Sequence, residues 1–324
     1  MGARFFSTER IRALAADPAR CTQPVPIQAI DFSRPFIPEH YTQLYYTPLY
    51  ARLSHEQRLA YNQLFGVRTN EFIMMLERDL IEHVLLPLRT HRRVKRQSGL
   101  AECLDIMITE ERRHYALFLD INRHSLPGVF TGARERYFSQ LPWGARAAFY
   151  LLGLVARRFA FPLWYLMAME ESSITLSRAM NRQRVTESLG ELEPHWVALH
   201  REHAKDEARH LHIDAHLIEL CISNSSKLTQ RIDAGLFQRM LGGGLSRPER
   251  SGSGVKVIRH LVKMRPELQP LEAKMIRAVL ALKDETAYQK SLFNREIMPL
   301  TFGIFDDTPA LADLPRHMVG YERH

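Results

Sequence analysis

The chain has 324 residues, of which 45% are hydrophobic and 25% charged, and these are the proportions of an ordinary globular protein. Its length is enough for one large helical domain or two small ones. The formal net charge of +8 would suit nucleic acid, anionic membranes or acidic partners, but a mixed, solvated surface is the simpler explanation. We therefore expect neither nucleic acid nor a membrane to be a partner.

The cysteines and the apolar stretches favour a soluble protein in a reducing compartment. Cys21, Cys103 and Cys221 are isolated and form no C-x-x-C pair, which argues against a disulfide framework and favours the cytoplasm. The N-terminal residues lack the continuous apolar segment of a signal peptide. The most apolar stretch, residues 147–169, contains two adjacent arginines, and a buried helix explains it better than a membrane span does.

The first predicted elements are an N-terminal arm and a long helix. Residues 1–53 contain many prolines and aromatics with weak periodicity, and we expect an arm that wraps the domain, with one short helix near residues 7–16. The long helix begins after Ser54, which is a favourable N-cap, and Gln57 stands at the capping-box position three residues later. The apolar pattern of this helix runs to about Pro87.

Three more long helices follow. The second covers residues 99–124 and stops before a Leu-Pro-Gly sequence, and a connector with a short helix is expected over residues 129–142. The third covers residues 143–181, with a break near Pro162. The fourth covers residues 194–223 and has a favourable proline in its first turn.

The C-terminal part is predicted to add helices to the same domain. Residues 241–254 are rich in glycine and serine, which indicates a flexible loop. Two helices near residues 255–264 and 270–293 then lead into a proline-rich tail. Strand signals are nearly absent, so the predicted fold is all-α, with residues 54–324 forming a single domain.

Two helices carry the pattern Glu-x-x-His, as Glu111 with His114 and Glu207 with His210. Residues three apart share one helix face, so each pair can present a carboxylate and an imidazole to one point. One such pair is common by chance on a polar helix. Two such pairs, together with one Glu from each of two other helices, are the recurrent ligand pattern of di-iron carboxylate sites in four-helix bundles. Carboxylates can bridge two irons, while each imidazole binds one of them.

The first long helix offers three glutamates, Glu71, Glu77 and Glu82. A glutamate that faces the interior of a bundle should have apolar neighbours three and four residues away on both sides. Only Glu77 meets this condition, because its neighbours at those positions are Ile73, Met74, Leu80 and Ile81.

The third long helix offers two adjacent glutamates, Glu170 and Glu171. Glu170 shares its face mainly with apolar residues, whereas the face of Glu171 includes Arg178, and arginine rarely points into a core. We therefore predict Glu170 as the ligand and keep Glu171 as the alternative. If Glu170 is the ligand, Glu171 is expected to be solvated or to support the ligands from outside.

Three polar residues beside these pairs extend the predicted site. His203 lies on the same face as Glu207 and His210, as an ordinary histidine or as a third imidazole ligand. Asp206 and Glu110 each precede a predicted glutamate ligand. Because metal-bound histidines usually donate their second N–H to a carboxylate, Asp206 is predicted to pair with His114, and Glu110 with His210.

In chain order, these residues resemble the p-aminobenzoate N-oxygenase family of ferritin-like diiron enzymes over residues 54–216. Ribonucleotide reductase small subunits, soluble methane monooxygenase and acyl-carrier-protein desaturases share four glutamates and two histidines with this pattern but lack an equivalent of His203. The complete predicted ligand set is Glu77, Glu111, His114, Glu170, His203, Glu207 and His210.

The resemblance implies a ferritin-like four-helix bundle that binds two iron ions and uses dioxygen to oxidise an amine nitrogen to a hydroxylamine, nitroso or nitro group. It also implies a homodimer and an external reductase or ferredoxin, for which the basic run at residues 89–96 is a candidate docking face. We predict no catalytic residue beyond the metal ligands. A diiron hydroxylase or desaturase acting on carbon and a non-catalytic iron-binding protein remain alternatives. The apolar residues beside the ligands are candidates for the substrate pocket, although such residues are usually plain core: Met74, Met107, Phe118, Met167 and Ile174.

Overall fold

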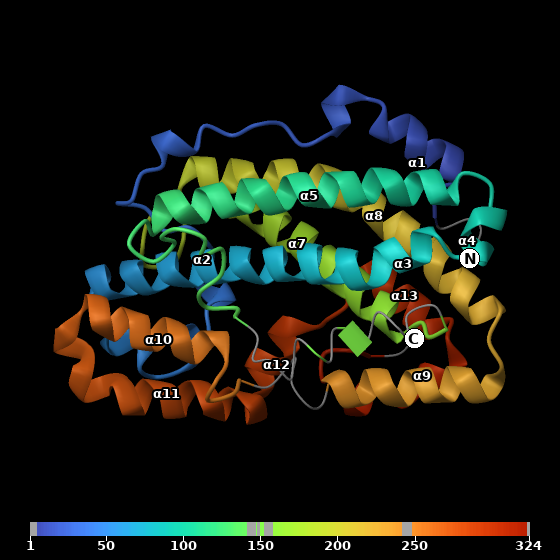
Figure 1. Ribbon diagram of the computed structural model, residues 1–324. Coiled ribbons are helices and arrows are strands. Elements are labelled where there is room, and N and C mark those ends of the chain that lie inside the picture. The colour runs from blue at the N-terminus through green and yellow to red at the C-terminus, as the bar shows by residue number, and fades with distance from the viewer. Residues whose placement is uncertain (1–4, 141–146, 148–149, 152–157, 242–247, 323–324) are drawn as a thin grey trace.

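The computed structural model describes residues 5–140, 147, 150–151, 158–241 and 248–322 (Figure 1). Over these residues the fold is all-α, as predicted, and it contains no β-strand, only an isolated bridge between Val185 and Glu191. The α-helices of the described residues are α1 (Thr8–Ala15), α2 (His55–Leu80), α3 (Leu86–Arg89), α4 (Arg92–Arg96), α5 (Leu100–Ser125), α7 (Phe161–Arg182), α8 (Pro194–Ser223), α9 (Lys227–Met240), α10 (Ser253–Met264), α11 (Glu272–Ala281), α12 (Thr286–Leu292) and α13 (Pro299–Asp306).

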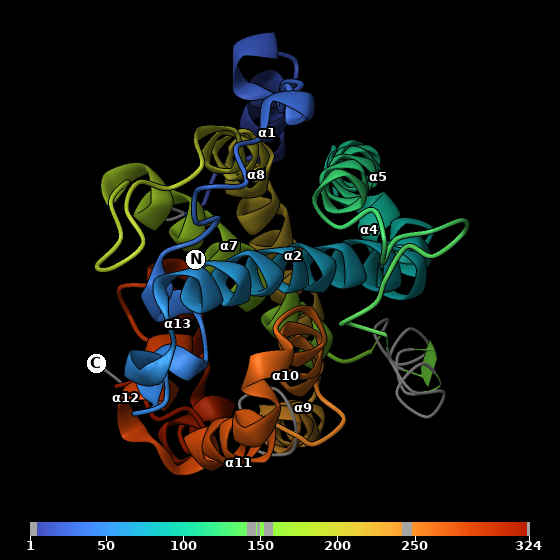
Figure 2. The ribbon, with the colours of Figure 1, turned by 90° about the vertical axis from the view of Figure 1, so that its left-hand side faces the viewer.

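The four longest helices pack on one another. Helix α2 packs on α5 and α7, while α8 packs on α7 and α5. The N-terminal arm lies along one side of this group, where α1 contacts both α5 and α8 (Figure 1). Helices α10, α11 and α12 lie on the opposite side, with α10 against α2 (Figure 2). Among the described residues, no helix is both long and apolar enough to span a membrane.

The ends of the long helices follow local sequence signals. Ser54 and Gln57 form the predicted capping box at the start of α2. At the start of α8, the side chain of Glu193 accepts a hydrogen bond of 2.6 Å from the backbone N–H of Trp196, and Pro194 occupies the first turn. Helix α5 follows Gly99, whose φ of 73° is a left-handed conformation that suits glycine.

The first long helix was predicted to run without interruption to about Pro87, and this prediction was wrong. Helix α2 ends at Leu80, a π-helical segment covers Ile81–Leu85, and α3 begins at Leu86. The reason is Pro87, which has no N–H to donate and whose ring conflicts with the carbonyl of residue 83 in a regular helix. A π turn accommodates this conflict, and such turns are frequent at functional sites.

Several other predicted boundaries were wrong. Residues 129–140 contain no helix, and the region predicted as one helix over 270–293 is divided into a 3₁₀ segment, α11, a second 3₁₀ turn and α12. Helix α9 was missed altogether, although Ser226 caps it by accepting from the backbone N–H of Thr229.

Other predicted segments lie partly outside the described residues. Those are 141–142 of the connector, most of 143–157 in the third helix, and 242–247 in the glycine-rich loop. The break near Pro162 is present, because a turn at residues 158–160 precedes α7 and Pro162 lies in the first turn of that helix.

Candidate metal centre

A layer of buried polar side chains separates two apolar clusters in the middle of the long helices. On α5, Ile108 belongs to one cluster and Phe118 to the other, and on α8, Leu211 and Leu199 are divided in the same way. The two Glu-x-x-His pairs and His203 lie between these positions. Burying so many ionisable groups between apolar clusters is costly unless they are paired or bind a cation.

The seven predicted ligand residues come together in two groups. One group is Glu77, His114, His203 and Glu207, and the other is Glu111, Glu170, Glu207 and His210. Each residue offers one oxygen or nitrogen atom, and within each group these atoms lie within 4.8 Å of one another. Glu207 belongs to both groups, so its carboxylate lies where it can bridge two metal ions.

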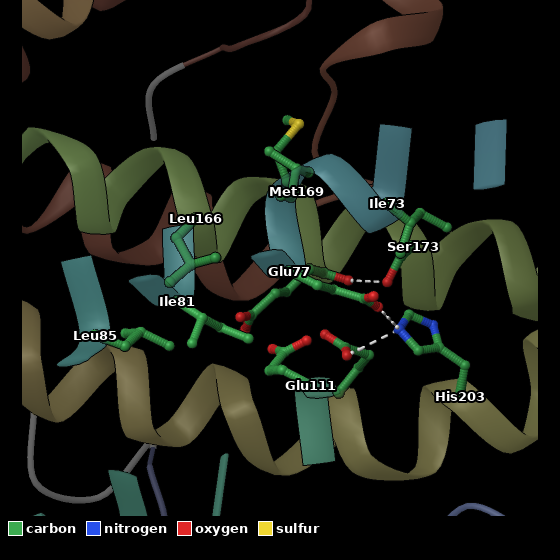
Figure 3. Close-up of a pocket in the computed structure, with 12 residues that line it drawn as sticks. Ile73, Glu77, Ile81, Leu85, Glu111, Leu166, Met169, Ser173 and His203 are labelled. Atoms are coloured by element: carbon green, nitrogen blue, oxygen red, sulfur yellow. Dashed lines mark hydrogen bonds and ion pairs between the residues drawn. The ribbon is translucent and has the colours of Figure 1, made fainter. Parts of the chain in front are cut away.

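Glu207 lies at the centre of the three imidazoles. Its Oε1 is 3.0 Å from His203 Nε2, 3.3 Å from His114 Nδ1 and 3.4 Å from His210 Nδ1. The Nε2 atom of His203 is also 3.2 Å from Glu77 Oε1, so His203 reaches the first group directly (Figure 3). In Figure 3 the side chains of Glu77, Glu111 and His203 point toward a common space.

Many polar atoms of this layer lack a hydrogen-bond partner among the described residues. They are buried and include both carboxylate oxygens of Glu77 and Glu170 and the Nδ1 atoms of His114 and His210. The imidazole nitrogens lie close to the carboxylates, but several of these contacts are too poorly aligned to be hydrogen bonds. A native structure tolerates few such groups, and carboxylate oxygens together with imidazole nitrogens are a donor set that fits divalent transition metals, iron included.

Two carboxylates support the histidines from the outer side, in the pairing that the sequence predicts. His114 Nε2 lies 3.0 Å from Asp206 Oδ2, and His210 Nε2 lies 2.9 Å from Glu110 Oε2. A carboxylate at Nε2 holds the proton on that nitrogen and leaves the lone pair of Nδ1 directed at the two groups. The outer hydrogen bonds therefore fix both the orientation and the tautomer that a metal requires.

Arg209 and the N-terminal arm complete this outer network. One guanidinium nitrogen of Arg209 is 2.5 Å from Glu110 Oε1 and 2.6 Å from Asp206 Oδ1, and the other donates to the carbonyl of Arg20. Thr22 in the arm donates its hydroxyl to Asp206 Oδ2 at 2.7 Å. The arm thus holds the same carboxylates that hold the histidines.

The pKa values reflect the same arrangement. Burial lowers the pKa of His114, but the hydrogen bond to Asp206 and the nearby carboxylates outweigh it and hold that pKa well above its usual range. Burial raises the pKa of Glu77 to about 7. Burial, and then the charges of Asp214 and Glu207, raise the pKa of Glu170 well above normal. Without a cation, Glu77 and Glu170 therefore hold a proton more readily than a free carboxyl group does.

The structure separates the two adjacent glutamates of α7. Glu170 joins the second group, whereas Glu171 accepts hydrogen bonds from the backbone N–H groups of Leu300 (2.9 Å) and Thr301 (2.8 Å) at the start of α13. Glu171 is therefore buried against the N-terminus of α13, and both expectations for it were wrong, since it is neither solvated nor a support for the histidines.

Asp214 is the acidic residue at the centre that sequence reasoning missed. It is fully buried, neither of its oxygens has a hydrogen-bond partner among the described residues, and burial raises its pKa to about 8. It lies four residues after His210 and seven after Glu207, so helical spacing alone would have placed it on the ligand face of α8. Its charge acts on Glu170.

A pocket borders both ligand groups between α2 and α7. It encloses about 380 Å³ of empty space, its opening to solvent included. Its lining consists of Ile73, Leu76, Glu77, Ile81, Leu85, Glu111, Leu166, Met169, Glu170, Ser173, His203 and Glu207 (Figure 3). None of the five apolar residues predicted for a substrate pocket lines it. Those five are buried in the two apolar clusters, so the usual explanation for apolar residues at helical spacing holds for them.

In comparisons with known proteins, no family model, curated protein or solved structure matches this chain. The residues and the geometry of the centre are therefore the basis on which function is inferred.

Proposed function

We propose that this chain is a non-haem diiron oxygenase that uses dioxygen to oxidise an amine nitrogen of a small biosynthetic substrate to a hydroxylamine, nitroso or nitro group. The observation that carries the proposal is the pair of four-residue ligand groups that share Glu207. One shared carboxylate between two buried sets of oxygen and nitrogen donors is typical of two metal ions held side by side.

The proposal includes a ferritin-like four-helix core made of α2, α5, α7 and α8, to which the arm and the C-terminal helices are added. In its favour, each of these four helices supplies at least one member of the ligand groups, and α5 and α8 supply the Glu-x-x-His pairs. That distribution matches the ligand pattern of di-iron carboxylate bundles, in which two helices each supply one glutamate and two each supply a Glu-x-x-His pair.

Iron is the metal we propose because four carboxylates offset much of the charge of two ferric ions in a buried site. The bound iron pair would supply the redox chemistry that activates dioxygen. The chain supplies the rest: Asp206 and Glu110 keep the protons of His114 and His210 on Nε2, and the surrounding apolar clusters restrict water.

His203 is the reason for proposing nitrogen rather than carbon as the atom oxidised. It is the third imidazole of the resemblance to the p-aminobenzoate N-oxygenase family, and its Nε2 lies 3.0 Å from the shared Glu207. The alternatives are a hydroxylase or desaturase acting on carbon and an iron-binding protein without organic turnover. The products distinguish the three.

We also propose an external electron donor, a reductase or ferredoxin, and a homodimeric assembly. In favour of an acidic donor, the basic run at residues 89–96 presents Arg92, Lys95 and Arg96 as exposed side chains on or beside α4. Opposite charges on two partners speed their encounter and weaken with added salt. Turnover that falls with salt when the donor is supplied separately would support this part of the proposal.

The test combines metal analysis with product analysis. Protein reconstituted with ferrous iron should contain two irons per chain and, with dioxygen and a reductant, should convert members of an amine panel to N-oxygenated products seen by mass spectrometry. His203→Ala should lose iron and N-oxygenation, whereas His195→Ala, which changes a histidine near the start of α8 and outside both groups, should keep them. A protein that binds no iron would overturn the proposal, and hydroxylated or desaturated carbon products would favour the alternative.

A further inference from the structure

The pocket beside the ligand groups has two chemically different walls. The metal-facing wall consists of carboxylates and His203. The aliphatic part of the lining comes from α2, its π-helical extension and α7, and its members are Ile73, Leu76, Ile81, Leu85, Leu166 and Met169. Figure 3 shows Ile81, Leu85 and Leu166 gathered at one end, away from His203. A molecule in this pocket would therefore lie against aliphatic side chains.

The described residues that line the pocket include no lysine and no arginine. A carboxylate or phosphate on a ligand would be buried there against aliphatic side chains with no lysine or arginine to pair with it, which is costly. A protonated amine would lose its hydration against the aliphatic wall, and with iron bound the glutamates would already be neutralised. The charge pattern thus favours an uncharged ligand.

Ser173 provides one polar anchor in this wall. Apart from the predicted metal ligands, it is the only hydrogen-bonding O–H or N–H side chain among the described lining residues, and its hydroxyl donates to the backbone carbonyl of Glu170 at 2.8 Å. A hydroxyl that donates once still has acceptor capacity, so Ser173 Oγ can accept an N–H from a ligand. It lies at the end of the pocket near His203, opposite the end formed by Leu85 (Figure 3).

We propose that this pocket binds an uncharged amine with an apolar body and no acidic group, with its N–H directed at Ser173 and its body against Ile81, Leu85 and Leu166. The substrate class rests on the proposed function, because the pocket is taken to be where oxidation occurs. It narrows that function, since an amine that carries a carboxylate is excluded. The amine end then lies beside the metal ligands, where an oxidised nitrogen would have to be.

Binding without turnover tests the substrate class separately from the chemistry. Iron-loaded protein is dialysed without dioxygen against aniline, toluene, benzylamine and 4-aminobenzoate. Aniline and toluene should bind, and the cation benzylamine and the anion 4-aminobenzoate should bind at least about tenfold more weakly than aniline. Equal or tighter binding of 4-aminobenzoate would overturn the proposal.

Two variants test the individual contacts. Ser173→Ala should weaken the binding of aniline about fivefold, which is the effect of one lost hydrogen bond. The affinity for toluene should not change, because toluene has no N–H. Met169→Lys introduces a cation at a half-buried position of the lining and should increase the affinity for 4-aminobenzoate relative to that for aniline. Met264→Lys, at a residue of α10 that is 45% exposed, is the matched control and should not change this preference.

Admitting dioxygen and reductant then separates the two proposals. Neutral ligands that bind as expected but yield no N-oxygenated product would leave the pocket assignment in place and count against the N-oxygenase. N-oxygenation of 4-aminobenzoate in preference to aniline would support the proposed function and overturn the substrate class. If Ser173→Ala weakened the binding of toluene as much as that of aniline, the proposed orientation of the amine would be wrong.

Discussion

The buried charges of this protein form two layers that differ in how they are satisfied. The inner layer contains the two ligand groups, and many of its oxygens and nitrogens have no hydrogen-bond partner among the described residues. The outer layer contains Glu110, Asp206 and Arg209, whose charges are paired with one another and with the histidines. Both layers are buried, so burial does not explain the difference.

The difference supports the proposal that the inner layer binds a cation. The outer layer contains its own arginine, whereas the inner carboxylates have imidazoles beside them but form no ion pair with a lysine or arginine among the described residues. A protein that needed these carboxylates only for stability would pair them, because an unpaired buried charge costs several kcal/mol. Changes in the inner layer should therefore affect metal binding most, and changes in the outer layer should affect folding and metal affinity together.

The largest effect is expected from Glu207→Gln, because Glu207 is the member shared by both groups. The amide keeps the size of the side chain but removes a charge and a bridging oxygen, so both metals should be lost at iron concentrations that saturate the unchanged protein. Elemental analysis after reconstitution measures this. Glu219→Gln, at an exposed position of the same helix, is the control and should retain its iron. Full iron content in Glu207→Gln would show that the inner layer is not the metal centre.

The next largest effect is expected from Arg209→Met in the outer layer. The substitution keeps an apolar side chain but removes the buried cation from Glu110 and Asp206, leaving them only the half-exposed Arg113, whose guanidinium is 3.7 and 3.6 Å away. Breaking a buried ion pair in this way typically costs about 3–5 kcal/mol. Denaturant unfolding of the metal-free protein should show this loss, whereas Glu207→Gln should not reduce the stability of the metal-free protein by as much. Equal losses in the two variants would remove the distinction between the layers.

Much of the inner layer was accessible from sequence because helical spacing determines which side chains share a face. The two Glu-x-x-His pairs, Glu77 and Glu170 were placed together from spacing and apolar neighbours alone. Arg209 was not singled out, because nothing in a sequence separates one buried arginine from the many exposed ones. Thr22 was beyond reach for a different reason: its contact with Asp206 spans the chain from the arm to α8.

The fold was predicted best where one helix carries a long, capped pattern and least where tertiary contacts decide. The capping box at Ser54 and the first-turn proline of α8 locate their helices well. The π-helical segment depends on how the chain resolves the conflict at Pro87, which periodicity does not reveal. The lining of the pocket was not found from the sequence, because the pocket lies between faces of α2 and α7 and only their packing shows which apolar side chains face a space.

A smaller effect is expected from Asp206→Asn, which tests how the outer layer acts on the inner one. The amide can keep a contact with His114 but no longer carries the charge that favours a proton on Nε2. Changes to such partners typically lower metal affinity about 10–100-fold. Titration with ferrous iron should show this loss mainly in the group that contains His114, and the variant should still bind two irons at saturation. Unchanged affinity would show that Asp206 serves only the fold.

The last expected effect is a dependence of stability on pH that bound metal should reduce. Burial raises the pKa of Glu77 to about 7 and that of Asp214 to about 8, so between about pH 5 and 8 the folded, metal-free protein holds protons that the unfolded chain has lost. The stability of the metal-free protein should therefore fall as pH rises through this window. The pKa of Asp206 is shifted downward instead, so the contribution of Asp206 is lost only in acid.

Thermal unfolding from pH 6 to pH 8.5 checks this, with and without iron. Metal ligands are bound in their deprotonated forms, so the loaded protein has fewer of these protons to lose, and its midpoint should change less than that of the metal-free protein. For a chain of 324 residues, each kcal/mol of difference corresponds to a midpoint shift of about 1.5 °C. Glu170→Gln removes one of the carboxylates with a raised pKa and should flatten the slope of the metal-free protein. Parallel slopes for the loaded and metal-free proteins would mean that the inner carboxylates do not exchange their protons for metal.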